Sequence, residues 1–453
     1  MSVLRHGLVP PTATGYNVER SLRFNSADSA YLNRTPASSS NLKTWTWSSW
    51  VKRSAFTTLT YYEVFAAAAS SATAIYFYND VFYFQITDSG GTVIGNVSSA
   101  AVFRDPSAWY HIVAVLDTTQ ATGSNRIKLY VNNVEQTLTF TTTPSQNSEA
   151  RINSSSHVHY VGGRSPYNFN GYMADVHFID GSALTPSSFG ENDTDTGVWK
   201  PKSYTGSYGT NGFKLTFSDN SNTTSTTLGK DTSGNGNNWT PNNFSVTAGA
   251  GNDSLVDTPT PYGTDTGAGG QVRGNYATLN PLDNGATLAN GNLNGSNSTT
   301  AWQTTKATFG MSSGKWYWEF SIASLGGSGA GFCGITQSGA STSNYVGSGA
   351  TGWGYYSANG NKYNNGSSSS YGNSYTTNDV IGVAFDADNG ELKFYKNGTV
   401  QNSGTAAYTG LTSGPYFPST TIADGSIVVN FGQRPFAYTA PSGFKALCTT
   451  NLP

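Results

Sequence analysis

Two segments of the chain share one pattern, in which apolar and polar side chains alternate and then end at an asparagine-rich turn. Residues 127–133 read IKLYVNN, and residues 392–398 read LKFYKNG. Alternation places one face of a β-strand against a core and the other face in water. Asn-Asn and Asn-Gly pairs tolerate the positive φ angles that a tight hairpin turn needs. Because each segment lies inside its own long series of strand patterns, the sequence predicts two β-sandwich modules.

The composition favours strands and turns over helices. Only 11% of the 453 residues are charged, which is under half of the roughly 25% of an average globular chain. Gly, Ser, Thr, Asn and aromatic residues stand in place of the missing charged residues. These residue types suit turns and pleated surfaces. No long stretch has a 3.6-residue apolar period. We therefore expect an all-β chain, too long for one ordinary core and made of at least two domains.

The charge and the N-terminus exclude several classes of partner. The net charge is −2 and no run of Lys or Arg occurs, so nucleic acid is not expected as a partner. The first residues, MSVLR, contain no apolar signal region, which predicts synthesis in the cytoplasm. The most apolar stretch, residues 64–86, contains Ser, Asn and Asp and alternates as strands do. Membrane insertion is therefore not expected.

Four segments are expected along the chain. Residues 1–20 have little periodicity and predict an extended N-terminal arm, which a second protein could hold in place. Strand patterns and turn signals from 21–190 predict the first sandwich. Residues 191–274 are turn-rich and predict an ordered extension and linker, with the linker at 248–274. The second sandwich is expected at 275–453.

The first series of strands resembles the laminin G-like, or concanavalin-like, jelly-roll family. The resemblance covers about residues 21–190 and rests on residues 109–113 (WYHIV), 128–132 (KLYVN) and 169–176 (FNGYMADV). Residues 183–189 follow and look like the short helix that closes the family's fold.

The second series resembles the SPRY (B30.2-like) domain family over about residues 300–440. Its carriers are residues 379–383 (DVIGV), the strand at 392–398, and the Asn-Phe-Gly of 430–432. The resemblance implies a β-sandwich that binds protein ligands through variable loops.

The carboxylates do not form a catalytic pair, so no catalytic residue is predicted. Cleavage of a glycoside needs two carboxylates about 5 Å or about 6.5–9.5 Å apart, and no Glu-x-Asp-x-x-Glu pattern occurs. Asp386 and Asp388 flank a hairpin turn, where Asp serves the backbone. Asp175 and Asp180 lie on a strand and its exit, which favours hydrogen bonding at the strand end.

Other catalytic patterns are also missing. The sequence has no nucleophile elbow, phosphate loop or Cys/His pair, and the glycine-rich run at 326–331 joins strands and precedes no helix. Cys333 lies in an apolar strand pattern and is interpreted as a small buried side chain. With Cys448 as the other cysteine, a disulfide framework is excluded. The chain is expected not to be an enzyme.

Neither a metal nor a cofactor is predicted, although two groups of residues offer ligands. His157 and His159 share one strand face, with His177 as the remaining member of a possible cluster, but no third ligand has a recognisable spacing. Calcium is more plausible for the laminin G-like family, because hard oxygen ligands suit it. Residues 219–222 (Asp219, Asn220, Ser221, Asn222) and Asp231 with Asn235 offer such oxygens. These segments are also ordinary turns.

Aromatic, glycine-punctuated loops in the second module are the best signal of a binding site. Residues 353–356 read WGYY and residues 362–365 read KYNN. Tyr with Asn, Ser and Gly is the composition of adaptable binding loops, and Tyr and Trp rings also stack on sugars. The predicted ligand-binding residues are Tyr355, Tyr356, Tyr363 and Asn364. The alternative is that Trp353 and Tyr355 fill the sandwich.

The combination resembles virion proteins of tailed bacteriophages. It implies a non-enzymatic tail fibre, spike or head-decoration component at the virion surface, which docks to other virion proteins through the arm. Its partner would be a host-surface glycan or protein, and a homo-oligomer is expected because fibres and capsid fittings repeat the symmetry of their mount. Two alternatives stay open: a purely structural decoration protein and a polysaccharide-degrading enzyme.

Overall fold

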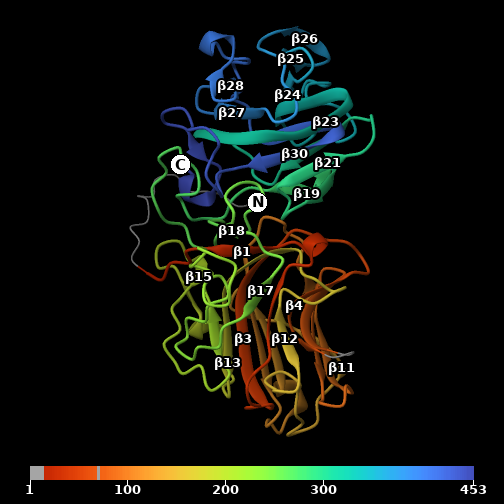
Figure 1. Cartoon of the computed structure of the whole chain (residues 1–453), viewed down its shortest axis with the longest axis vertical. Coiled ribbons are helices and arrows are strands. Elements are labelled where there is room, and N and C mark those ends of the chain that lie inside the picture. The colour runs from red at the N-terminus through yellow and green to blue at the C-terminus, as the bar shows by residue number, and fades with distance from the viewer. Residues whose placement is uncertain (1–14, 69–71) are drawn as a thin grey trace. The chain divides into compact units, whose positions relative to one another are not determined.

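A computed structural model describes residues 15–68 and 72–453 of the chain (Figure 1). The chain forms two compact units, of which the first ends at Thr260 and the second begins at Pro261. The described residues form strands and five short 3-10 helices, and none of them forms a helix long and apolar enough to span a membrane. The predicted all-β fold is confirmed.

The first unit contains two eight-stranded antiparallel sheets, here called sheet A and sheet B, and their strands are drawn in Figure 1. Sheet A has the order β10-β9-β8-β3-β13-β1-β18, with β16 also paired to β13. Its strands are β1 (Ser21–Phe24), β3 (Thr44–Arg53), β8 (Tyr110–Asp117), β9 (Ile127–Val131), β10 (Val134–Glu135), β13 (Gly171–Asp180), β16 (Phe213–Leu215) and β18 (Ser254–Leu255).

Sheet B has the order β11-β7-β6-β5-β4-β12-β2-β17. Its strands are β2 (Tyr31–Arg34), β4 (Tyr61–Ala68), β5 (Ala72–Tyr78), β6 (Val81–Thr87), β7 (Val93–Val102), β11 (Leu138–Thr142), β12 (Val158–Val161) and β17 (Thr240–Asn242). The remaining elements of the unit are a small ribbon of β14 (Gly190–Asn192) and β15 (Trp199–Pro201), with η1 (Ser26–Asp28), η2 (Gly123–Asn125) and η3 (Pro186–Ser188). The short 3-10 turn η3 lies where a closing helix was expected.

Aromatic side chains from both sheets form the core of the first unit. Trp45 and Trp47 of β3 are fully buried and meet Phe84 of β6 and Phe65 of β4, with ring centroids 5.4 and 6.0 Å apart. Such rings bury much apolar area and favour offset or edge contacts. The inward-facing side chains of the alternating strands therefore pack together and hold the two sheets against each other.

The segment after residue 190 belongs to the first unit and covers the outer face of sheet A. Tyr208 of this segment, with Phe189 just before it, packs on Val113, Val115 and Ile179, which point away from the core. The segment also contributes β16 and β18 to sheet A and β17 to sheet B.

Buried ion pairs tie the last part of this segment to sheet A. Arg23 pairs with Asp253 at 2.9 Å, and Lys52 pairs with Asp257 at 2.8 Å. The Trp109 indole also donates to Asp257. The stretch 248–274, predicted as the linker, thus divides between the two units.

The N-terminal arm predicted at 1–20 lies outside the described residues as far as residue 14. Tyr16 donates a hydrogen bond from its hydroxyl to Asp175 at 2.7 Å, and the Val18 N–H donates to Thr260 Oγ1 at 3.0 Å. Residues 16–18 are therefore held by the first unit.

The second unit is a sandwich of thirteen hydrogen-bonded strands. They are β19 (Leu279–Asn284), β20 (Thr287–Ala289), β21 (Asn294–Asn297), β22 (Gln303–Ala307), β23 (Lys315–Thr336), β24 (Gly352–Tyr356), β25 (Asn361–Asn364), β26 (Ser367–Ser370), β27 (Val380–Asp386), β28 (Glu391–Lys396), β29 (Thr399–Val400), β30 (Phe417–Asn430) and β31 (Lys445–Ala446). Two 3-10 turns, η4 (Asn402–Gly404) and η5 (Thr449–Asn451), complete the unit.

The long strands β23 and β30 run together through the second unit (Figure 1). The first part of β23 pairs with β27, and its last part pairs with β24. The pairing with β30 shifts register between Ile322 and Ser324 and again between Leu325 and Ala330. Bulges of this kind bend a strand and increase its twist. The bent strands β23 and β30 therefore contribute to both layers of the sandwich.

The asparagine turns have the predicted geometry. Asn132 and Asn133 have φ angles of 47° and 67°, and Asn397 and Gly398 have 47° and 77°. Two successive positive φ angles match the twist of a two-residue hairpin. Each turn closes an alternating strand, β9 or β28, onto a short partner, β10 or β29.

Candidate ligand-binding face

The alternation of β24 separates the predicted tyrosines of the second unit onto two faces. Tyr355 is fully buried. Its ring stacks on Phe394 at 5.1 Å, and its hydroxyl donates to the Asn373 carbonyl. Tyr355 therefore has no surface for a ligand, and its prediction as a ligand-binding residue is wrong. Trp353 shares its face and meets Tyr416 edge-on at 5.3 Å.

Tyr356 points to the opposite face and joins an aromatic cluster, defined here as Trp302, Phe332, Tyr345, Tyr356 and Tyr363. Phe332 is buried at the centre, and the other four rings are half-buried around it. Tyr356 and Tyr345 stack on Phe332 at 4.5 and 4.9 Å. Tyr363 and Trp302 meet Phe332 edge-on at 5.3 and 5.5 Å. The cluster presents four rings at different angles to solvent.

Strand register and one glycine bring these rings together. Phe332 of β23 lies opposite Tyr356 of β24, and Gly354 lies opposite Tyr363 of β25. A Cβ on Gly354 would lie 2.3 Å from the carbonyl oxygen of Val346 and 3.0 Å from the Phe332 ring. The absence of a side chain at Gly354 thus lets the loop that carries Tyr345 pack closely against the sheet.

Two of the predicted site residues contribute rings to this cluster, and a third supports its loops. Tyr356 and Tyr363 lie 5.6 Å apart in an edge-to-face arrangement. The side-chain amide of Asn364 donates to the Gly352 carbonyl at 2.7 Å, and so links the end of β25 to the start of β24. Trp302 and Tyr345 were missed, because nothing in their local sequence places them beside β24.

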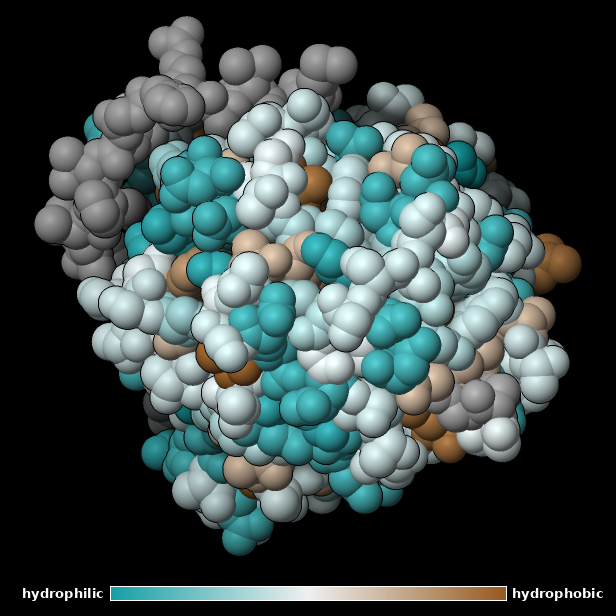
Figure 2. Space-filling view, turned by 90° about the horizontal axis from the view of Figure 1, so that it is seen from above, coloured by the Kyte–Doolittle hydropathy of each residue, from teal (hydrophilic) through white to brown (hydrophobic). Residues whose placement is uncertain are grey.

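The segments that carry Trp302, Tyr345, Tyr356 and Tyr363 contain almost no charged residues. Residues 284–305 contain no charged side chain, and residues 340–378 contain only Lys362. The Lys362 ammonium donates to the Ala407 carbonyl and lies 5.3 Å from the centre of the Tyr408 ring. Figure 2, which views the molecule from above, shows mostly hydrophilic and near-neutral residues, with isolated hydrophobic ones. A ligand at the cluster would meet aromatic rings among hydroxyl and amide groups.

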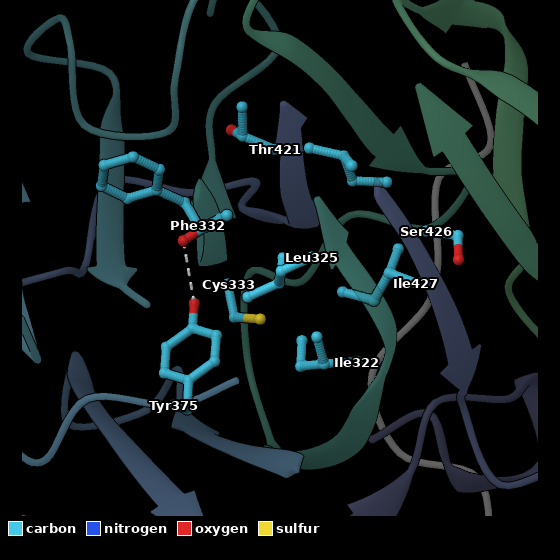
Figure 3. Close-up of a pocket in the computed structure, with 10 residues that line it drawn as sticks. Ile322, Leu325, Phe332, Cys333, Tyr375, Thr421, Ser426 and Ile427 are labelled. Carbon is cyan, nitrogen blue, oxygen red and sulfur yellow. Dashed lines mark hydrogen bonds between the residues drawn. The ribbon is translucent and has the colours of Figure 1, made fainter. Parts of the chain in front are cut away.

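An apolar cavity in the second unit is too small to bind a ligand (Figure 3). It has a volume of about 10 Å³, and its lining includes Ile322, Leu325, Cys333 and Ile427. A space of this size holds about one water molecule. Burial raises the pKa of the Cys333 thiol to about 12, so this side chain is an unreactive part of the core.

A polar depression of about 380 Å³ lies elsewhere on the second unit, with Ser357, Ser374, Thr376 and Lys396 in its lining. The Lys396 ammonium already donates to the Ser374 carbonyl at 2.8 Å and pairs with Asp379 at 3.2 Å. Its charge is therefore committed within the fold.

The possible histidine cluster considered from the sequence does not assemble. His159 is buried, its Nε2 accepts the Asn153 N–H at 2.8 Å, and its Nδ1 donates to the His157 carbonyl at 3.0 Å. His177 lies on sheet A, with its Nε2 3.1 Å from Asp175. Within residues 15–68 and 72–453, no three His, Cys, Asp or Glu side chains form a group that could hold a metal ion.

The carboxylates considered for calcium serve turns. Asp219 accepts hydrogen bonds from the backbone and hydroxyl of Ser221 at 3.2 and 2.6 Å. Asp231 accepts from the backbone N–H groups of Lys214, Ser233 and Asn237. The Asn235 amide donates to backbone carbonyls. These contacts match the turn interpretation.

The carboxylates considered for catalysis also bond within the fold. Asp386 accepts from Asn389 and pairs with Lys315 at 2.9 Å, while Asp388 accepts the Gly314 N–H at 2.7 Å. Asp180 accepts from Asn153 and Asn211.

Comparison with known families defines the class of the two units. Residues 25–188 match the family model described as the concanavalin A-like lectin/glucanases superfamily, and residues 315–434 match that of the SPRY domain. The chain is thus an all-β protein with a laminin G-like (concanavalin-like) domain followed by a SPRY domain.

Among curated proteins, the chain is similar to the ATP-dependent RNA helicase DDX1 of Xenopus laevis, with 30% identity over 172 residues, 37% of this chain and 22% of that protein. The probable ATP-dependent RNA helicase ddx1 of Dictyostelium discoideum is 30% identical over 151 residues, 33% of this chain and 19% of that protein. The E3 ubiquitin-protein ligase RKP of Arabidopsis thaliana is 39% identical over 82 residues, 17% of this chain and 6% of that protein. The chain spans about a fifth or less of the length of these relatives.

A solved structure, the crystal structure of the SPRY domain of human HERC1, has 19% identity and a TM-score of 0.29, and the match covers 33% of this chain and 96% of that one. The relatives named are eukaryotic, so they do not support the predicted phage source.

Proposed function

We propose that the chain is a non-enzymatic binding protein whose SPRY domain binds a neutral glycan at the aromatic cluster. The observation that carries the proposal is the set of four half-buried rings around Phe332 in a surface that is almost free of charge. Aromatic rings pack against the apolar C–H faces of sugars, while Asn, Ser and Thr side chains supply hydrogen bonds. A charged ligand would find few partners here.

A glycan array with the purified chain tests this site. Trp302→Ala and Tyr356→Ala each remove a ring from the rim of the cluster, and both should weaken binding to the glycans that the wild type retains. Tyr438→Ala is the matched control, because Tyr438 is an exposed tyrosine of the same unit outside the cluster. Unchanged binding by both cluster variants would contradict the proposal. Binding of peptides in place of glycans would identify a protein ligand, the class that the SPRY resemblance implies.

The absence of enzymatic activity is part of the proposal. Its support is that Asp175, Asp180, Asp386 and Asp388 each take part in hydrogen bonds or ion pairs within their own unit. Incubation with the glycans found on the array should release no new reducing ends. Release of reducing ends would assign the chain to the polysaccharide-degrading enzymes.

We further propose that this binding activity is displayed on a virion surface, with other virion proteins as partners and a host-surface glycan as ligand. Its support comes from the sequence, which has two binding-type sandwiches in series, low charge and an N-terminal segment with the pattern of an arm. The eukaryotic relatives named above match over 17–37% of the chain. Mass spectrometry of purified particles tests the location, and particles without the chain would overturn it. Particles with the chain but no glycan binding would favour a purely structural decoration protein.

A further inference from the structure

A lysine forms one of the most deeply buried ion pairs of the first unit. The side chains of Lys52 and Asp257 are 0% and 1% exposed, and Lys52 Nζ lies 2.8 Å from Asp257 Oδ2. Arg23 and Arg53 supply the cations of two other buried pairs. A guanidinium keeps its proton in proteins, whereas the amine of a lysine can lose one and act as a nucleophile. The Lys52–Asp257 pair can therefore react in a way that the arginine pairs cannot.

Segments far apart in the sequence bring the two side chains together. Lys52 lies on β3, opposite Tyr172 of β13. Asp257 lies two residues beyond the end of β18 and comes 205 residues after Lys52. The centre of the Tyr172 ring is 5.7 Å from Lys52 Nζ, and the Trp109 ring meets Tyr172 at a centroid distance of 6.4 Å. Both rings are buried, so aromatic side chains help to separate the pair from bulk water.

Burial makes the charged form of Lys52 costly. It lowers the pKa of the Lys52 ammonium, against the opposing effect of Asp257. Transfer of one proton from the ammonium to the carboxylate leaves a neutral amine beside a neutral carboxylic acid. In a buried site this transfer removes two charges that are expensive to keep away from water. The amine and the carboxyl carbon are then in position to react as nucleophile and electrophile.

The other oxygen of Asp257 has a hydrogen-bond donor of its own. The Trp109 indole N–H donates to Oδ1 at 3.0 Å, while Lys52 contacts Oδ2. Attack of the Lys52 amine on Cγ places negative charge on Oδ1. A fixed donor at that oxygen stabilises such a charge, as it does in an oxyanion hole. The two oxygens therefore differ, because Oδ1 is held as a carbonyl oxygen and Oδ2 lies beside the source of protons.

We propose that Lys52 and Asp257 condense to an intramolecular isopeptide bond. Lys52 Nζ forms a bond to Asp257 Cγ, and Oδ2 leaves as water with two protons from the ammonium, while the amide nitrogen keeps the third. Oδ1 stays as the amide carbonyl and still accepts the Trp109 N–H. The reaction uses no oxidant and no cofactor, and its product carries no buried charge. The folded chain contains the ion pair first, and the amide accumulates afterwards.

This cross-link joins β3 of sheet A to the segment that follows β18. It concerns the first unit alone and is independent of the ligand proposed for the aromatic cluster.

Mass spectrometry of the denatured full chain, taken directly after purification and again after a week at room temperature, tests the reaction. The wild type should become lighter by one molecule of water. Lys52→Arg keeps a positive charge beside Asp257 but cannot condense in this way, and it should keep its full mass. Trp109→Phe removes the donor to Oδ1 and should slow the loss of water about 100-fold.

Cyanogen bromide, which cleaves after methionine, locates the bond. Met173 lies between Lys52 and Asp257 in the sequence, and Met311 follows both. On a denaturing gel, the fragment that ends at Met173 should stay joined to the fragment that ends at Met311 in the reacted wild type and should separate from it in Lys52→Arg. Among the lysine–carboxylate ion pairs of the described residues, Lys52–Asp257 is the one whose members lie on opposite sides of Met173.

A wild-type chain that keeps its full mass after the week would overturn the proposal. Loss of water with complete separation of the two fragments would also contradict it. That result would place the dehydration elsewhere, at an Asp-Gly sequence such as 180–181 or 424–425, where the next backbone nitrogen can close a succinimide. Both outcomes are read from the wild type, so they hold even if a variant fails to fold.

Discussion

At the residue scale, a difference of one position decides whether a tyrosine of β24 can bind. Tyr355 faces Phe394 in the core, while Tyr356 faces Phe332 in the aromatic cluster. The sequence could indicate an aromatic binding loop, because Tyr356 and Tyr363 lie among Asn, Ser and Gly. It could not separate Tyr355 from Tyr356, since a strand's face depends on its register with neighbouring strands.

The Glu63 carboxyl predicts a pH dependence of stability. Burial raises its pKa from 4.5 to about 7, against the opposing effect of Arg164. The folded state then binds a proton that the unfolded state releases between these two pH values, so this residue's contribution to stability falls as the pH rises. Glu63→Gln should remove this pH-dependent loss of stability. The free energy of unfolding of the variant relative to wild type should be higher at pH 8 than at pH 4.5 by up to about 3 kcal/mol.

Urea unfolding at both pH values measures this difference, and Glu135→Gln, at an exposed glutamate of the same unit, is the control. An equal difference from wild type at both pH values would show that Glu63 ionises normally.

His159 predicts a pH dependence of stability with the opposite sign. Burial lowers its pKa from 6.5 to about 3, against the opposing effect of its hydrogen bond to the His157 carbonyl. The stability that this residue contributes is present above pH 6.5 and is lost as the pH falls toward 3. His159→Gln should lower stability at pH 7 but flatten the decline below pH 6. Urea unfolding from pH 4 to 7 checks this, and parallel curves for variant and wild type would contradict it.

At the scale of elements, the sequence predicts the long alternating strands but not the short strands that side-chain contacts hold in place. The patterns at residues 127–133 and 392–398 predicted β9, β28 and their turns. In the segment 191–274, only the run around β16 alternates, and β17 and β18 are three and two residues long. Side-chain contacts hold these short strands in place, and the buried ion pairs of Asp253 and Asp257 are examples. Such ion pairs give the sequence no periodic pattern from which a strand could be predicted.

The Lys52–Asp257 pair allows a test of whether a buried ion pair holds this part of the segment to sheet A. Both side chains are almost fully buried, with the two charged atoms 2.8 Å apart. Asp257→Ala leaves the Lys52 charge without its partner and should destabilise the first unit by about 3–5 kcal/mol. The double variant Lys52→Met/Asp257→Leu should recover most of this loss, since a hydrophobic pair of similar volume is often as stable as a buried ion pair. Thermal unfolding measures both, and an unchanged melting temperature for Asp257→Ala would contradict the tether.

At the scale of the whole molecule, the order of two sandwich families followed from local patterns, whereas the composition of the aromatic cluster did not. Trp302, Phe332 and Tyr345 come from separate segments, which meet because β22 and β23 both pair with β30 and β23 also pairs with β24. The glycan proposed as their ligand is inferred from that assembled face.

The second unit contains both its own core and the whole aromatic cluster. We predict that residues 261–453 expressed alone unfold in one cooperative transition and keep the glycan profile of the full chain's SPRY site. Circular dichroism melts and the array check the two parts of this prediction. A broad, non-cooperative melt would show that the unit ending at residue 453 does not fold independently.

Calorimetric titration of the full chain with its best array glycan tests the central claim most directly. Removing two rings from the aromatic cluster in a Trp302→Ala/Tyr356→Ala variant should cost about 1–3 kcal/mol, or roughly 5- to 150-fold in Kd. The variant should keep the wild-type melting temperature within a few degrees, and Tyr438→Ala should bind as wild type does. Wild-type affinity in the double variant, or an equal loss in Tyr438→Ala, would contradict a glycan site at this cluster.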